Sequence, residues 1–184
     1  KLVQRNLFLD TDSRLRVVTG IAYAHGQLQQ FRNSAAAYQL ARQVDDRAEY
    51  FRFQISARNS AQAKPSEIEN LANQYIQKYP EQEDRFVVQG YVAQAYQREM
   101  NDNRARDLYR EMLYNSPMDV GEISKFISLN GSEPPQLTDS ETHLRAAIGK
   151  QPKKAYAIRY YLAFTLARDR LKDLPKSRQV CREF

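Results

Sequence analysis

Side chains able to act as nucleophiles, bases or metal ligands are scarce in this 184-residue chain. It contains two histidines, His25 and His143, and one cysteine, Cys181. A hydrolytic triad needs a nucleophile, a base and an orienting group, and a structural zinc ion needs several thiolate or imidazole ligands. No His-Glu-x-x-His pair occurs, and a lone cysteine forms neither a thiolate cluster nor an internal disulfide. We therefore predict no catalytic triad and no metal site.

Other signatures of catalysis are equally weak. Paired carboxylates, which could share acid and base roles, occur at Asp45-Asp46, at Asp10 with Asp12, and at Glu81 with Glu83. All lie in expected turns, where solvent and helix N-termini already stabilise acidic side chains. The six glycines are scattered, and neither common Gly-rich phosphate-binding loop is present. The sequence thus favours a protein that is not an enzyme and holds no cofactor.

Positive charge gathers at the C-terminal end. The formal net charge is +6, and from Lys150 onward ten Lys or Arg stand against three Asp or Glu, an excess of seven that leaves minus one elsewhere. Four aromatic residues are interleaved with these cations: Tyr156, Tyr160, Tyr161 and Phe164. Such a segment could bind RNA, an acidic polysaccharide or an anionic membrane surface, or could be a solvated helix face. We name its candidate basic patch by five residues: Lys154, Arg159, Arg168, Arg170 and Lys172.

Helices must position these residues, because apolar side chains recur at spacings of three and four. Val88, Val92 and Tyr96 form one stripe. After the polar break 101–103, a second stripe contains Ala105, Leu108, Tyr109 and Met112. Two such stripes joined by a short polar turn indicate an antiparallel helix hairpin. No segment alternates long enough for a strand, and no apolar run reaches the length of a membrane span, so we predict an all-α fold without a transmembrane segment.

A period of about 35 residues divides the chain. Turn-like residues that follow helical runs stand at Asp46, Pro80, Pro117 and Pro152, with spacings of 34, 37 and 35. Because proline ends one helix and suits the start of the next, these marks predict units at 13–46, 47–80, 81–117, 118–152 (irregular) and 153–184 (incomplete). We expect these four to five hairpins to form a single array, itself part of a longer protein. An irregular helical bundle is the alternative.

Local signals predict where particular helices begin. Ser66 is the expected N-cap of one helix, with Glu69 as its capping-box partner. Thr138 and Glu141 make the same pattern later in the chain. The paired prolines within 130–135 predict a loop.

The third unit resembles the tetratricopeptide repeat family. Val92-Ala93 stands at the family's Leu-Gly pair, Tyr96 at its Tyr, Ala105 at its first Ala, Tyr109 at its aromatic and Pro117 at its closing Pro. Gln89 and Met112 depart from the family pattern. In the first unit Thr19-Gly20, Tyr23, Phe31, Tyr38 and Ala41 echo the motif if two residues are inserted in the turn.

The resemblance implies a right-handed superhelix whose first helices line a concave groove that binds a protein or peptide segment. The candidate groove residues are Tyr50, Gln54, Tyr91, Gln94, Gln97 and Arg98. The last unit would add Lys154, Ala157, Ile158 and Tyr161. Arrays of this family occur in cytosolic complexes and in periplasmic parts of bacterial polysaccharide-export and outer-membrane assembly systems. The resemblance therefore suits a scaffold in either compartment, including an envelope or secretion assembly, and the oligomeric state stays open.

Overall fold

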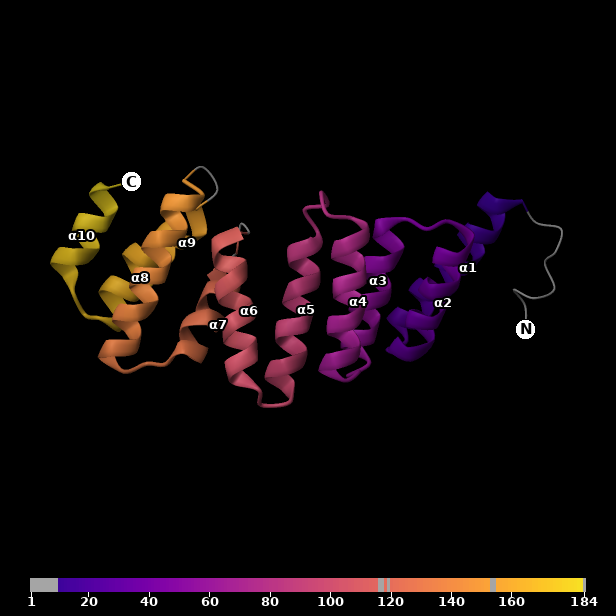
Figure 1. Cartoon of the computed structure of the whole chain (residues 1–184), viewed down its shortest axis with the longest axis horizontal. Helices are drawn as coiled ribbons and strands as arrows, with labels where there is room; N and C mark the ends of the chain where they lie inside the picture. Colours follow the sequence, from indigo (N-terminus) through magenta and orange to yellow (C-terminus); the bar gives the residue numbers. More distant parts are fainter. Residues whose placement is uncertain (1–9, 116–117, 119, 153–154, 184) are drawn as a thin grey trace. The chain divides into compact units, whose positions relative to one another are not determined.

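The computed structural model describes residues 10–115, 118, 120–152 and 155–183, and within these ranges every regular element is a helix (Figure 1). The predicted all-α fold is confirmed. The chain divides into two compact units, Lys1–Glu99 and Met100–Phe184. The boundary falls inside the predicted unit 81–117, between its two helices. None of the described helices is long and apolar enough to cross a membrane.

The first unit is a series of helices that pack in chain order. It contains α1 (Thr11–Gln27), α2 (Phe31–Val44), α3 (Ala48–Ser60), α4 (Pro65–Lys78) and α5 (Arg85–Arg98). Figure 1 shows these helices following one another in chain order. Each helix contacts the next one along the chain, and α3 also contacts α5. The pairs α1–α2 and α3–α4 occupy the predicted units 13–46 and 47–80, whereas the predicted hairpin of α5 with the helix after it falls across the boundary of the two compact units.

Small residues and rings fill the core of this unit. Ala22, Ala35 and Ala41 have no exposed surface, which lets neighbouring helices approach closely. Phe51 of α3 meets Tyr75 of α4 edge to face, with ring centroids 5.7 Å apart. Burial of a ring of this size stabilises the fold by about 2–3 kcal/mol, and the pair geometry adds about 1 kcal/mol.

The turns that close the first two helix pairs have the same geometry, 33 residues apart. Gln29 and Gln62 adopt left-handed backbone conformations with φ of 57° and 56°. The Gln29 N–H donates to the carbonyl of Gly26, and the next N–H reaches back to His25; around Gln62 the same two bonds go to Asn59 and Arg58. This pattern is the Schellman ending of an α-helix. A repeated turn therefore accompanies the repeated spacing of the sequence.

Burial in α1 does not follow the alignment expected for the first unit. Gly20 is exposed, with nothing within 4 Å of a Cβ placed on it, and Tyr23 is 64% exposed. Ala22 is the buried small residue of α1, and the Ser34 hydroxyl of α2 donates to its carbonyl at 2.8 Å. The separation of Ala22 from Ser34 is twelve residues, as it is from Ala93 to Ala105 in sequence. Burial therefore favours Ile21-Ala22 over Thr19-Gly20 as the counterpart of Val92-Ala93, and that alignment needs no insertion.

Two helix starts also differ from expectation, for a common reason. α4 begins at Pro65 and α8 at Pro134, so neither Ser66 nor Thr138 is an N-cap. Proline suits the first helical turn because its φ is already helical and its missing N–H would have no intrahelical partner there. The paired prolines therefore open a helix rather than extend the loop. Gln136 completes that start by accepting a hydrogen bond from the Glu133 N–H at 3.2 Å.

The second unit is less regular. It contains α6 (Asp102–Asn115), α7 (Val120–Asn130), α8 (Pro134–Lys150), α9 (Tyr156–Tyr160), the π-helix η2 (Tyr161–Arg170) and α10 (Leu174–Arg182). α7 and α8 both contact α6, and α10 packs along η2. Among the residues predicted to face the interior, Ala105, Tyr109 and Met112 are buried as expected. Pro117, the predicted closing proline, lies outside the described residues.

Helix η2 continues α9 with a wider winding. The N–H of Leu171 bonds to the carbonyl of Leu166, five residues back. π-helical turns are rare and often lie at functional sites. The sequence predicted an incomplete unit over 153–184 but did not predict this change of winding. The turn that follows η2 contains Lys172, which adopts the same left-handed conformation (φ 54°) as Gln29 and Gln62.

Candidate binding surfaces

Two predicted groove residues of the first unit take part in helix packing instead. Gln54 is only 4% exposed, and its side-chain oxygen accepts a hydrogen bond from Arg42 of α2 at 2.8 Å. Tyr50 packs against the buried cluster that includes Leu15 and Val18. Both side chains therefore join α3 to its neighbours, and Gln54 has no surface to offer a partner.

Two more predicted groove residues belong to a network centred on Asn59, near the end of α3. The Asn59 amide donates to the Gln94 side-chain oxygen at 3.2 Å and accepts from the Arg98 guanidinium at 2.8 Å. Arg98 also donates to the carbonyl of Ala63 at 3.2 Å. Asn59 is 9% exposed, whereas Arg98 is exposed, so this network joins α5 to the α3–α4 turn from a buried amide to a guanidinium at the surface. Gln94 and Arg98 thus have structural roles that periodicity did not reveal.

Tyr91 and Gln97 are the predicted groove residues that stay partly exposed on α5. No hydrogen bond of either side chain is described within 10–99. They remain predictions for partner contact. In the last unit, Ile158 and Tyr161 are only 2% exposed and belong to the core. Lys154 lies outside the described residues.

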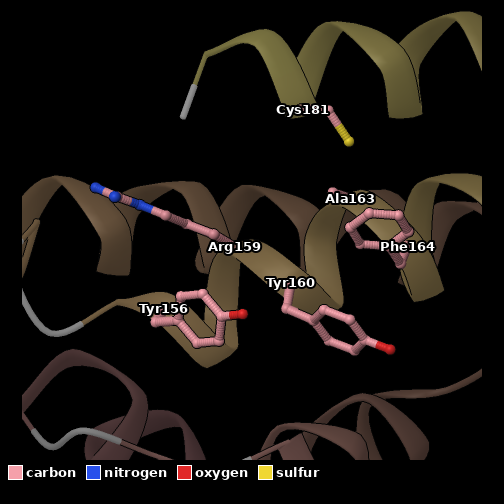
Figure 2. Close-up of a pocket in the computed structure, with 6 residues that line it drawn as sticks. All are labelled: Tyr156, Arg159, Tyr160, Ala163, Phe164 and Cys181. Carbon is pink, nitrogen blue, oxygen red and sulfur yellow. The ribbon is translucent and has the colours of Figure 1, made fainter.

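An aromatic pocket lies between α10 and the helix formed by α9 and η2 (Figure 2). Its volume is about 300 Å³. Six residues line it, and this set is what we call the aromatic pocket: Tyr156, Arg159, Tyr160, Ala163, Phe164 and Cys181. Figure 2 shows Cys181 pointing from α10 toward the helix that carries Ala163 and Phe164. The pocket therefore has one wall of rings and a second wall that carries a thiol.

The three rings of the pocket are unusually exposed for their type. Tyr156 is 81% exposed, and Tyr160 and Phe164 are each 46% exposed. A spacing of four residues places them along one side of the helix, and the Tyr160 and Phe164 ring centroids lie 5.2 Å apart. Tyr161 and Leu162, which lie between Tyr160 and Phe164 in sequence, are buried. The side of the helix that carries Tyr161 and Leu162 is thus packed in the core, and the side that carries the three rings is exposed to solvent.

The thiol-bearing wall is held in place by packing between the last two helices. The Ser177 hydroxyl of α10 donates to the carbonyl of Ala163, which repeats the bond from Ser34 to Ala22 in the first pair. Val180, beside Cys181, has no exposed surface. Asp173 caps the start of α10 by accepting from the Lys176 N–H at 2.9 Å. The pocket is therefore built on anchored helices.

Positive charge surrounds the aromatic pocket, although the predicted basic patch does not form one cluster. Arg159 lines the pocket, whereas Arg168, Arg170 and Lys172 lie at the far end of η2 and in the following turn. Four exposed cations of this segment make no ion pair within the described ranges: Arg170, Lys172, Arg178 and Arg182.

Nearby acidic side chains are already engaged. Asp169 forms an ion pair with Arg168 at 2.7 Å, and its hydrogen bond raises the pKa of the Arg168 guanidinium. Glu183 pairs with Arg145 of α8 at 3.0 Å. With Asp173 used as a cap, the acids of 155–183 have partners within the unit, and the surface around the pocket keeps an excess of positive charge.

Both histidines occupy structural settings. The His25 ring nitrogen Nδ1 lies 2.7 Å from the Gln30 side-chain oxygen at the α1–α2 turn. His143 lies 2.5 Å from the Tyr114 hydroxyl, and its ring packs edge to face on Phe126. Within the described residues, no group of three His, Cys, Asp or Glu side chains is placed to hold a metal ion.

The sequence contained a signal for the pocket. Tyr156, Tyr160 and Phe164 follow one another at four-residue spacing, whereas the buried Tyr161 breaks that series. The contribution of Cys181 could not be read in this way, because it depends on how α10 packs on η2. Comparison with known protein families, with curated proteins and with solved structures finds no match to this chain.

Proposed function

We propose that this chain is a helical-repeat module of the tetratricopeptide type that binds a segment of a partner protein, with the aromatic pocket as its principal contact surface. The observation that carries the proposal is the exposure of Tyr156, Tyr160 and Phe164 around a cavity of about 300 Å³. Consecutive helix pairs and the repeated Schellman turns support the repeat architecture.

Exposed rings at a pocket favour binding of a partner over a purely structural role. Large aromatic side chains dominate interface energetics, because they bury much area at little loss of side-chain entropy. The Tyr160 and Phe164 rings already contact each other at a tilt of 31°, with centroids 5.2 Å apart. The pocket lining combines rings with a guanidinium and a small residue, which suits an inserted side chain.

A selection from a displayed library of random peptides tests this proposal. The chain and its Tyr160→Ala/Phe164→Ala variant would be used in parallel. Because both side chains are half exposed, the variant should keep its helical content and melting temperature. The control is Tyr23→Ala, which removes an exposed ring from α1, outside the pocket. We expect peptides that bind the wild type and the Tyr23 variant but not the pocket variant; if no peptide distinguishes them, the proposal fails.

Polyanion binding is the second candidate, favoured by the exposed and unpaired side chains of Arg170 and Lys172 at the end of η2. Charge reversal at Arg168, Arg170 and Lys172 should then abolish binding of oligo-uridine RNA or of an acidic polysaccharide. Such binding should also fall steeply between low and physiological salt, because phosphate contacts release counterions. RNA binding that resists both salt and charge reversal would remove this candidate.

A further inference from the structure

We infer that the segment held by the aromatic pocket is acidic: a peptide whose single large apolar side chain enters the pocket while flanking carboxylates face the surrounding cations. This inference rests on the proposed protein-binding function and adds the chemistry of the partner. It is carried by the shape of the pocket together with the charge around it.

The pocket has room for one large apolar side chain. Its rings and Ala163 form an apolar wall, and Cys181 limits the opposite side (Figure 2). At about 300 Å³ the cavity accommodates a Phe or Leu side chain without room for a folded element. A peptide can insert such an anchor while its backbone stays at the surface.

The surface around the pocket is positive along both of its walls. Arg178 lies three residues before Cys181 on α10, so helical spacing places the two on neighbouring turns of the same side. Arg182 follows Arg178 by four residues on that helix. Arg159 lines the pocket on the ring-bearing wall. Because the acids of this segment already have partners, carboxylates from another chain would complement Arg178 and Arg182.

A nucleic acid could also place phosphates on cations and bases on rings, but the pocket suits a side chain better. Sequence-tolerant binding of bases needs rings that present open faces as platforms. Here Tyr160 and Phe164 pack against each other, and α10 bounds the pocket on the other side. The arrangement is a slot for one inserted group.

Three synthetic peptides of equal length test the inference by fluorescence anisotropy on the full chain. Each carries one central phenylalanine, flanked on both sides by glutamate, serine or lysine. We expect the glutamate peptide to bind most tightly and the Phe164→Ala variant to lose it. Arg178→Glu/Arg182→Glu should weaken the glutamate peptide about tenfold and improve the lysine peptide. The matched control, Arg16→Glu/Arg32→Glu, makes the same change in net charge on exposed residues of α1 and α2 and should leave affinity unchanged.

Each other outcome overturns the inference in a recognisable way. If the serine peptide binds as tightly as the glutamate peptide, and still needs Phe164, the pocket binds protein segments without charge selection and only the proposed function survives. If oligo-uridine RNA binds in a Phe164-dependent manner, the partner is a nucleic acid. If sedimentation shows that the chain self-associates through Phe164, the occupant is a second copy. Absence of binding by the glutamate peptide to the folded chain also refutes the inference, whereas the proposed function fails only if no selected peptide distinguishes the wild type from the pocket variant.

Discussion

Lys176 of α10 places its Nζ 2.6 Å from Oε2 of Glu141 in α8, whose side chain is 7% exposed. Arg145 donates to the other Glu141 oxygen at 2.9 Å. One buried carboxylate thus lies between two cations from different helices. Because α10 also carries Cys181, the ion pair between Glu141 and Lys176 helps to fix a wall of the aromatic pocket.

Glu141→Gln should destabilise the second unit by about 1–3 kcal/mol. The substitution keeps the side-chain shape but leaves two cations without their shared anion, and loss of one partner of a buried ion pair is costly. The partial exposure of Lys176 and Arg145 reduces that cost. The measurement is the urea midpoint of unfolding. Glu183→Gln, which removes an exposed partner of the same Arg145, is the control and should cost less than about 1 kcal/mol; equal losses would contradict the role of burial.

Arg98→Ala should lower the stability of the first unit by about 1–2 kcal/mol, because it removes two hydrogen bonds that join α5 to the α3–α4 turn. Thermal unfolding followed by circular dichroism measures the effect. Gln97→Ala is the matched control on the same helix turn and should leave the melting temperature unchanged. If Arg98→Ala melts like the wild type yet loses a bound peptide, Arg98 is a partner-binding residue as the sequence suggested.

Gln62→Gly should stabilise the first unit by about 1 kcal/mol. Gln62 holds a left-handed conformation (φ 56°), which costs a residue with a Cβ about 1–2 kcal/mol and costs glycine little. Gln29→Gly should have the same effect, since its turn has the same hydrogen bonds. Chemical unfolding of each variant measures the gain. The control Gln39→Gly, in the exposed interior of α2, should instead destabilise by about 0.5–1 kcal/mol; a loss at Gln62 as well would show that its side chain is needed.

The sequence was sufficient to predict the all-α fold class, because apolar residues spaced three and four positions apart determine which face of each helix is buried. It placed Ala105, Tyr109 and Met112 in the core on that basis alone. It could not place polar side chains that join helices, because Gln54 and Arg98 satisfy the same periodicity whether they face a partner or Arg42 and Asn59. Only the packing of one helix on the next separates these roles.

At the helix starts and in the first unit, the expectation relied on residue type, and neighbouring residues or burial decided otherwise. The pattern at Ser66 and Glu69 is a genuine capping signal, yet Pro65 supplies a competing start one residue earlier and prevails. In α1, Gly20 was chosen by residue type, whereas Ala22 is the small residue that is buried and accepts a hydrogen bond from Ser34. Residue type alone is a weak guide in a degenerate repeat, and the spacing between the two buried small residues is the stronger one.

Stability should fall at alkaline pH as Tyr109 ionises. Burial raises the pKa of Tyr109 to about 12 from its ordinary value of 10.0, and the carboxylate of Glu122 adds to the shift. Since the folded pKa exceeds the unfolded one, this contribution is fully present below pH 10 and is lost as pH rises toward 12. The raised pKa of Tyr109 corresponds to about 1–3 kcal/mol in the free energy of unfolding. In Tyr109→Phe the urea midpoint of unfolding should change less between pH 10 and 12 than in the wild type. An equal change in both proteins would contradict the role of Tyr109.

Cys181 offers a direct readout of the aromatic pocket, because it is exposed, lines the pocket and is the only cysteine in the sequence. Alkylation with a bulky maleimide should place a substituent in the pocket and abolish binding of the glutamate-flanked phenylalanine peptide. The melting temperature should change little, because the thiol is not part of the core. Conversely, bound peptide should slow alkylation, as measured by mass spectrometry of the labelled fraction. Cys181→Ser, treated with the same reagent, controls for reaction elsewhere and should keep its binding. If the labelled chain binds the peptide as well as the unlabelled chain does, the peptide lies outside the space between Cys181 and Phe164, and the aromatic pocket is not the binding surface.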